Sequence, residues 1–241
     1  MEFHARYYNP TNAVCALVGD VTLEKARELA NIYFARYPAG NRAPEQLTRE
    51  PPQQGPRKSI RFLNGTRTPL VRISFHTARM GTNDFYALDA MTMVLSHGRS
   101  ARMTQDIINK GRAIQALAYN PDNRYSGMAV LGGSPNEPNE LKDQNVTVEE
   151  KRYAYIKACE EAEEILLAEV KKLKTELVLR LELERIKKLN QREFLDRMRS
   201  NETLADTMAT LEVQIGWRYL TTYLEKIAEV TAEDIRRVAK K

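Results

Sequence analysis

The sequence predicts an α+β domain whose mostly antiparallel or mixed sheet carries helices on one face. Two observations lead to this class. Strand and helix patterns alternate through residues 13–133 in the order strand, helix, two strands, two helices, two strands. Residues 147–241 then show long helical patterns and no strand pattern, so this part of the domain is expected to be helical. We expect residues 1–241 to form a single domain.

The first predicted strand is the continuous apolar run of residues 13–19, which is typical of a strand covered on both faces. A helix is expected to begin after Thr22, with Leu23, Ala26 and Leu29 on one side, and to end near Tyr37. Residues 41–56 are rich in Pro, Gln and Arg without periodicity. They are predicted to be an internal linker.

Two further strands, residues 58–63 and 70–77, are separated by Asn64-Gly65, a strong turn signal. The second strand alternates Val71, Ile73 and Phe75 with Arg72, Ser74 and His76. This alternation predicts one buried face and one polar face. His76 on the polar face is either a surface histidine without a role or part of an edge that accepts an extended peptide.

Residues 81–119 predict a compact unit in the middle of the chain. A helix over 84–95 is capped by Thr82 or Asn83 and ends at Gly98, and a second short helix covers 100–109. A strand over 113–119 follows, and residues 126–133 are expected to pair with it antiparallel.

The helical part is expected to begin at a capping box formed by Thr147 and Glu150. A second helix is predicted over residues 177–195, and a third from about 202 to 217. Thr231 is expected to cap the last, short helix.

Composition excludes several classes of protein. The 241 residues are 42% apolar and 29% charged, and no apolar run approaches the ~20 residues of a membrane helix. The net charge of +5 comes from basic and acidic residues that are interleaved, which disfavours a nucleic-acid binder. Cys15 and Cys159 are predicted to be buried thiols rather than a disulfide or metal pair. No signal peptide is apparent, and the compartment stays open between bacterial cytoplasm and periplasm.

The sequence resembles the pitrilysin or insulinase family of zinc metallopeptidases, the inverzincins, and specifically the non-catalytic second module shared with mitochondrial processing peptidase. Five stretches carry this resemblance in the order of the family. They are FHARYYNPTN followed by AVCALVGD (3–20), YFARYPAG (33–40), EPPQ (50–53), DFYALD with LSHGRSAR (84–102), and ELERIK through VTAEDI (182–235).

The resemblance implies one half of a clamshell that closes around an unfolded peptide, with zinc held in the other half by an inverted His-x-x-Glu-His motif. Here the only histidines are His4, His76 and His97, and none belongs to such a motif. We therefore expect no metal ligand and no catalytic residue in this chain. We also expect the chain to be inactive alone and to start at a point that falls, in the family, near the end of the catalytic half. The expected partners are a catalytic half or subunit, a peptide substrate and a second chain in a homo- or heterodimer. The alternative is a non-enzymatic scaffold or assembly subunit, like the core subunits of respiratory complexes.

Some members of the family place an arginine, and seven residues later a tyrosine, beside the zinc, where they hold the substrate carbonyl. Arg112 and Tyr119 have this spacing, and both side chains are donors suited to an oxyanion. An alignment anchored on residues 100–102 puts Ile108 and Gln115 there instead. The other alternative is that Arg112 is a solvated turn residue and Tyr119 an aromatic at a strand end.

Overall fold

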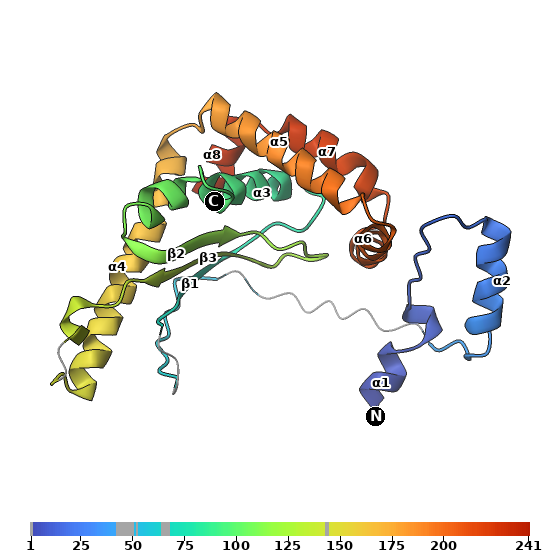
Figure 1. Cartoon of the computed structure of the whole chain (residues 1–241), viewed down its shortest axis with the longest axis horizontal. Coiled ribbons are helices and arrows are strands. Elements are labelled where there is room, and N and C mark those ends of the chain that lie inside the picture. Colours follow the sequence, from blue (N-terminus) through green and yellow to red (C-terminus); the bar gives the residue numbers. More distant parts are fainter. Residues whose placement is uncertain (1, 42–50, 52, 64–67, 143–144) are drawn as a thin grey trace. The chain divides into compact units, whose positions relative to one another are not determined.

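The computed structural model in Figure 1 describes residues 2–41, 51, 53–63, 68–142 and 145–241. The chain divides into two compact units. The N-terminal unit comprises Met1–Gly65 and Arg197–Val213, and the sheet unit comprises Thr66–Asp196 and Gln214–Lys241. Most of the predicted linker over 41–56 and the predicted turn at Asn64-Gly65 lie outside the described residues.

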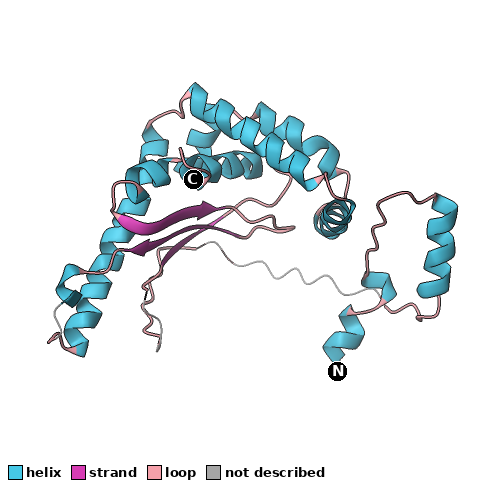
Figure 2. Ribbon diagram, viewed as in Figure 1, coloured by secondary structure: helices cyan, strands magenta, loops and turns pink. Residues whose placement is uncertain are grey.

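The sheet unit contains a three-stranded antiparallel sheet of β1 (Val71–His76), β2 (Ala113–Tyr119) and β3 (Met128–Pro135). Their order is β1-β3-β2, so β3 is the central strand (Figure 1). Figure 2 shows the strands of this sheet in magenta. The strands predicted over 70–77, 113–119 and 126–133 are thereby confirmed. The predicted antiparallel pairing of the last two is also confirmed.

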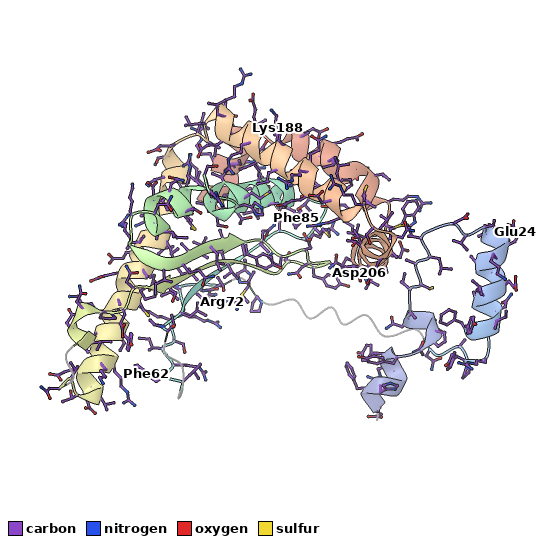
Figure 3. The ribbon with its side chains drawn as sticks, viewed as in Figure 1. Glu24, Phe62, Arg72, Phe85, Lys188 and Asp206 are labelled. Carbon is purple, nitrogen blue, oxygen red and sulfur yellow. The ribbon has the colours of Figure 1, made fainter. Side chains whose placement is uncertain are left out.

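Helices cover one face of this sheet, as predicted (Figure 1). The helix α3 (Asn83–Ser96) packs on β2, and α4 (Val148–Thr175) packs on β3 and β1. The helix α8 (Ala232–Lys240) lies against both of these helices. The side chain of Phe85, at the start of α3, is fully buried between helix and sheet (Figure 3).

The local signals around α3 are confirmed. The Thr82 hydroxyl accepts a hydrogen bond from the N–H of Phe85 and so caps the helix. Gly98 and Gly111 have φ values of 84° and 66°, a left-handed conformation that glycine adopts without steric cost. The short helix predicted over 100–109 is mostly a π-helical turn, η2 (Thr104–Ile108), with Ile107 fully buried.

The helical part follows its predicted caps. Thr147 and Glu150 form a reciprocal capping box at the start of α4, and Thr231 with Asp234 does the same for α8. The helix α5 (Arg180–Arg197) matches its prediction closely. The helix expected to reach residue 217 is α6 (Asn201–Gln214), and α7 (Tyr219–Glu229) was not predicted as a separate helix.

The helix α4 is asymmetric along its length. Its 28 residues span about 42 Å at 1.5 Å per residue, so it is much longer than the eight-residue strand β3. Its first half extends past the sheet in Figure 1. All of its buried residues lie in the second half, beginning at Ala162 and ending at Leu173.

The N-terminal unit contains α1 (Glu2–Tyr7), the 3-10 turn η1 (Pro10–Asn12), α2 (Leu23–Tyr33) and nearly all of α6. The prediction of strands over residues 13–19 and 58–63 was wrong, since neither segment belongs to a strand. A strand forms only where another strand supplies its hydrogen bonds, and an apolar pattern does not reveal that partner. Phe75, predicted to be buried, is 46% exposed. Within the described ranges, no helix is both long and apolar enough to cross a membrane.

Candidate functional site: the open face of the sheet

The sheet has a second face, turned away from the helices, which we call the open face. Strand register identifies its residues: Arg72 and Leu117 both pair with Gly132. A Cβ on Gly132 would lie 3.2 Å from the Leu117 side chain, whereas one on the next residue, Gly133, would lie 3.0 Å from Leu166 of α4. By this alternation the open face comprises Arg72, Ser74, His76, Gln115, Leu117, Tyr119, Met128, Val130, Gly132 and Ser134.

Figure 3 places Arg72 on the side of the sheet away from α3. The side chains at the margins of this face are mostly hydrogen-bond donors. Arg72 and His76 lie on β1, and Gln115 and Tyr119 lie on β2. None of the three strands contains an aspartate or glutamate. The face is therefore suited to peptide carbonyls and carboxylates, which accept hydrogen bonds.

The outer edge of β1 is also available, because β1 pairs only with β3 among the described strands. An edge strand presents N–H and C=O groups that can pair with an added extended chain. Arg72, Ser74 and His76 along this edge are exposed.

An irregularity in β2 sets which of its side chains reach the open face. Ala113 pairs with Pro135 and Gln115 pairs with Ser134, so Ile114 is an extra residue on this strand. The side chain of Ile114 is 59% exposed. After the irregularity, ordinary alternation puts Gln115, Leu117 and Tyr119 on the open face. Leu117 lies across Gly132 from Arg72, and Tyr119 lies across Val130 from Ser74.

Arg112 and Tyr119 are not brought together. Arg112 precedes β2 with an exposed side chain, and its N–H donates to the Ile107 carbonyl at 2.9 Å. Tyr119 ends β2, 55% exposed, so the two Cα atoms are roughly 20 Å apart along the strand. Of the alternative pair, Gln115 lies exposed on the open face, whereas Ile108 is half-buried in η2.

Ion pairs fix the turn that leads to Arg112. Arg102 binds Glu182 of α5 through Nε–Oε1 and Nη2–Oε2 contacts of 2.9 and 2.8 Å. These hydrogen bonds lower the pKa of the Glu182 carboxyl. Lys172 of α4 contacts Asp106 at 3.2 Å and the buried Glu169 at 2.7 Å. The charged residues were visible in the sequence, but the pairs Arg102–Glu182 and Lys172–Asp106 join positions 80 and 66 residues apart.

A second network, also not predicted, lies behind the sheet. The Tyr223 hydroxyl donates to Asp89 at 2.8 Å and accepts from the Asn190 amide at 2.9 Å. Burial raises the pKa of Tyr223, so its hydroxyl stays protonated. The network joins α3, α5 and α7 and supports the helical layer. None of its three residues, Tyr223, Asp89 and Asn190, belongs to the open face.

The three histidines have different surroundings. His4 stacks on Tyr8 with centroids 4.7 Å apart, His76 ends β1, and His97 binds Glu193 at 2.6 Å. Among the described residues, no group of three or more His, Cys, Asp or Glu side chains could hold a metal ion. The prediction that both cysteines are buried was wrong for Cys15, which is exposed, whereas Cys159 is half-buried. Neither cysteine forms a disulfide.

Comparison with known proteins places these features in a family. The family model described as the peptidase M16 inactive domain matches residues 1–190. The zinc protease PqqE of Helicobacter pylori is 26% identical over 243 residues, which cover 99% of this chain and 50% of that protein. The chain therefore spans about half the length of this curated relative.

Solved structures share the fold. A protease from Helicobacter pylori matches with a TM-score of 0.81 and 24% identity, over 99% of this chain and 54% of that one. A peptidase M16 inactive domain from Pseudomonas fluorescens matches with a TM-score of 0.71 and 18% identity, over 98% and 52%. A chain of complex III2 from Candida albicans matches with a TM-score of 0.53 and 13% identity, over 73% and 40%. The family match covers most of the sequence, and the chain belongs to the peptidase M16 inactive-domain family.

Proposed function

We propose that this chain is the zinc-free half of a zinc metalloendopeptidase, and that it encloses and positions an extended peptide substrate. The observation that carries the proposal is the family match over residues 1–190 to a domain described as inactive. A curated zinc protease twice as long leaves room for a second half. The zinc motif would then be supplied by that half, on the same polypeptide or on a partner subunit.

The open face would be the wall against which the substrate lies. An extended peptide requires backbone partners and side-chain donors, and the β1 edge with Arg72, His76, Gln115 and Tyr119 offers both. Because Arg112 and Tyr119 stand at opposite ends of β2, they would bind the peptide at two separate points. Such contacts strengthen substrate binding and need not act on a single oxyanion.

The proposal makes no use of a metal in this chain, since the described residues form no group of ligands for one. Zinc in the other half would polarise the substrate carbonyl and activate a water molecule. This chain's own residues would bind and orient the peptide and would keep bulk water from it.

The test is hydrolysis of an unstructured fluorogenic peptide. This chain alone with added Zn²⁺ should show no activity, and a separately produced half that carries His-x-x-Glu-His should be stimulated at least tenfold by adding it. Chelator-sensitive turnover by this chain alone would overturn the proposal. Absence of any stimulation would favour the non-enzymatic scaffold instead.

The same assay tests the two predicted contacts. Tyr119→Phe and Arg112→Ala should each raise KM severalfold with a smaller change in kcat, because they remove binding partners. Tyr153→Phe on α4 and Arg180→Ala on α5 are matched controls, since both side chains are strongly exposed and far along the chain from β2. If all four variants have the same KM and kcat, Arg112 and Tyr119 do not contact the substrate.

A further inference from the structure

Positive charge is concentrated in the strands of the sheet and in the loops next to them. Residues 68–82 and 112–136 contain β1, β2 and β3 together with these loops. They hold four arginines and a single acidic residue, Asp122, so their formal net charge is +3. The whole chain of 241 residues has a formal net charge of +5. More than half of this excess therefore belongs to the part of the chain that forms the sheet.

Two of the basic side chains in this region lie on the open face. Arg72 and His76 belong to β1 and lie four residues apart, with the small Ser74 between them on the same face. At about 3.3 Å per residue, their Cα atoms are roughly 13 Å apart. On β2 the donors Gln115 and Tyr119 have the same spacing. The open face thus carries two pairs of donors, each pair separated by four strand residues.

The side chains of these four donors are not engaged elsewhere. Within the described ranges, none of them takes part in a hydrogen bond, an ion pair or a ring contact. Other cations of the sheet unit are engaged, since Arg102 binds Glu182 at 2.8 Å and Lys172 binds Glu169 at 2.7 Å. The donors of the open face therefore keep their capacity for a ligand that supplies acceptors.

We propose that the open face selects an acidic peptide, bound in extended form with carboxylate side chains at positions i and i+4. This inference rests on the proposed function and adds the class of substrate. Alternate side chains of an extended chain point to the same side, so those at i and i+4 match the roughly 13 Å between Arg72 and His76. The Arg72 guanidinium would bind one carboxylate through paired N–H donors, and a ring N–H of His76 would donate to the other.

The same face disfavours other charged ligands. The three strands contain no aspartate or glutamate, so a lysine or arginine of a peptide would find no counter-charge there and would be repelled by Arg72. A nucleic acid is a poorer match, because its binding depends on many cations that neutralise many phosphates. Arg72 is the only lysine or arginine within the three described strands. The charge of this face therefore suits a peptide with a few carboxylates.

Fluorescence anisotropy with the full chain tests the inference. Three labelled, unstructured peptides of equal length carry aspartate, asparagine or lysine at positions i and i+4 and are otherwise identical. The dissociation constant of the aspartate peptide should be at least fivefold below that of the asparagine peptide, and the lysine peptide should bind most weakly. The difference should shrink as salt is raised, because ions screen the attraction. Equal dissociation constants for the aspartate and asparagine peptides would overturn the inference, as would tighter binding of a single-stranded oligonucleotide.

Charge reversal locates the preference on the sheet. Arg72→Glu should invert the order, so that the lysine peptide binds most tightly, and the milder Arg72→Gln should reduce the preference for aspartate at least twofold. Arg236→Glu is the matched control for net charge, since Arg236 lies on α8, which packs against α3 and α4 in the helical layer. All three variants should keep the far-ultraviolet circular-dichroism signal of the wild type. If Arg236→Glu alters the preference as much as Arg72→Glu does, total charge sets it and the inference fails.

The hydrolysis assay separates this inference from the proposed function. The chain should stimulate cleavage of the aspartate peptide by the zinc-carrying half at least fivefold more than cleavage of the asparagine peptide. Equal stimulation for both peptides would overturn the acidic preference and leave the proposed function intact. If no peptide is cleaved faster but the aspartate peptide still binds most tightly, the proposed function fails while the acidic binding site stands.

Discussion

At the scale of single residues, the Arg102–Glu182 pair ties the helical turn before β2 to α5. The two side chains are only 14% and 21% exposed, and the Leu179 N–H also donates to Glu182 at 2.9 Å. Replacing one partner leaves a partly buried guanidinium without its counter-charge. Glu182→Gln should therefore lower the free energy of unfolding by about 1–3 kcal/mol, measured by urea denaturation.

The exposed pair Arg180–Glu184 is the matched control on the same helix. Glu184→Gln should change the free energy of unfolding by less than about 0.5 kcal/mol, because solvent screens this pair. If the two variants lose equal stability, the Arg102–Glu182 contact stabilises the fold no more than the exposed Arg180–Glu184 pair does.

The pH dependence of this loss has a definite sign. The Arg102 hydrogen bonds hold the pKa of Glu182 below its ordinary value of 4.5 in the folded protein. The folded state therefore gains stability from the ionised carboxylate above pH 4.5, and loses it as pH falls through the lowered pKa. The stability gap between the wild type and Glu182→Gln should close in that acidic range, measured by thermal unfolding across pH 3–7.

At the scale of elements, the two central glycines of β3 face different surroundings. A Cβ on Gly133 would meet Leu166 at 3.0 Å and the Gln115 carbonyl at 3.1 Å, whereas one on Gly132 would meet only the Leu117 side chain. Gly133→Ala should cost about 1–3 kcal/mol of unfolding free energy, because backbone cannot move aside. Gly132→Ala should cost less, since a side chain at the open face can rotate. Chemical denaturation of both variants checks the order.

Elements with local signals were predictable, and elements that depend on a distant partner were not. Thr82, Thr147 and Thr231 fixed the starts of three helices through contacts within four residues. Residues 13–19 carry an equally clear strand pattern, but no strand forms there. The irregularity at Ile114 follows from pairing between strands, and the exposure of Phe75 follows from how little packs on the helix side of β1 there. No local pattern records either.

The candidate site was predictable to a similar extent. The alternation around β1 correctly identified Arg72, Ser74 and His76 as the polar side of that strand. The spacing of Arg112 and Tyr119 suggested one joint site, whereas the strand between them keeps their Cα atoms roughly 20 Å apart. Whether either residue contacts substrate stays a prediction.

At the scale of the whole molecule, nearly all of the core belongs to the sheet unit. Of the buried apolar residues in the described ranges, every one except Leu211 lies in Thr66–Asp196 or Gln214–Lys241. Removing residues 1–56 should thus leave cooperative unfolding, with Tm lowered by no more than a few degrees. Calorimetry of the truncated chain checks this, and loss of a cooperative transition would show that the removed part stabilises the core.

The uneven burial of α4 has a consequence for its motions. Its first turns carry the Thr147–Glu150 capping box but no buried side chain, while residues from Ala162 onward are held against the sheet. Opening of the first half exposes little apolar surface and therefore costs little free energy. Amide hydrogen exchange should be graded along this one helix, rapid through Tyr153 and slow by orders of magnitude at Leu166 and Leu173. One continuous helix would thus contain both a labile arm and a part that opens only when the whole sheet unit unfolds.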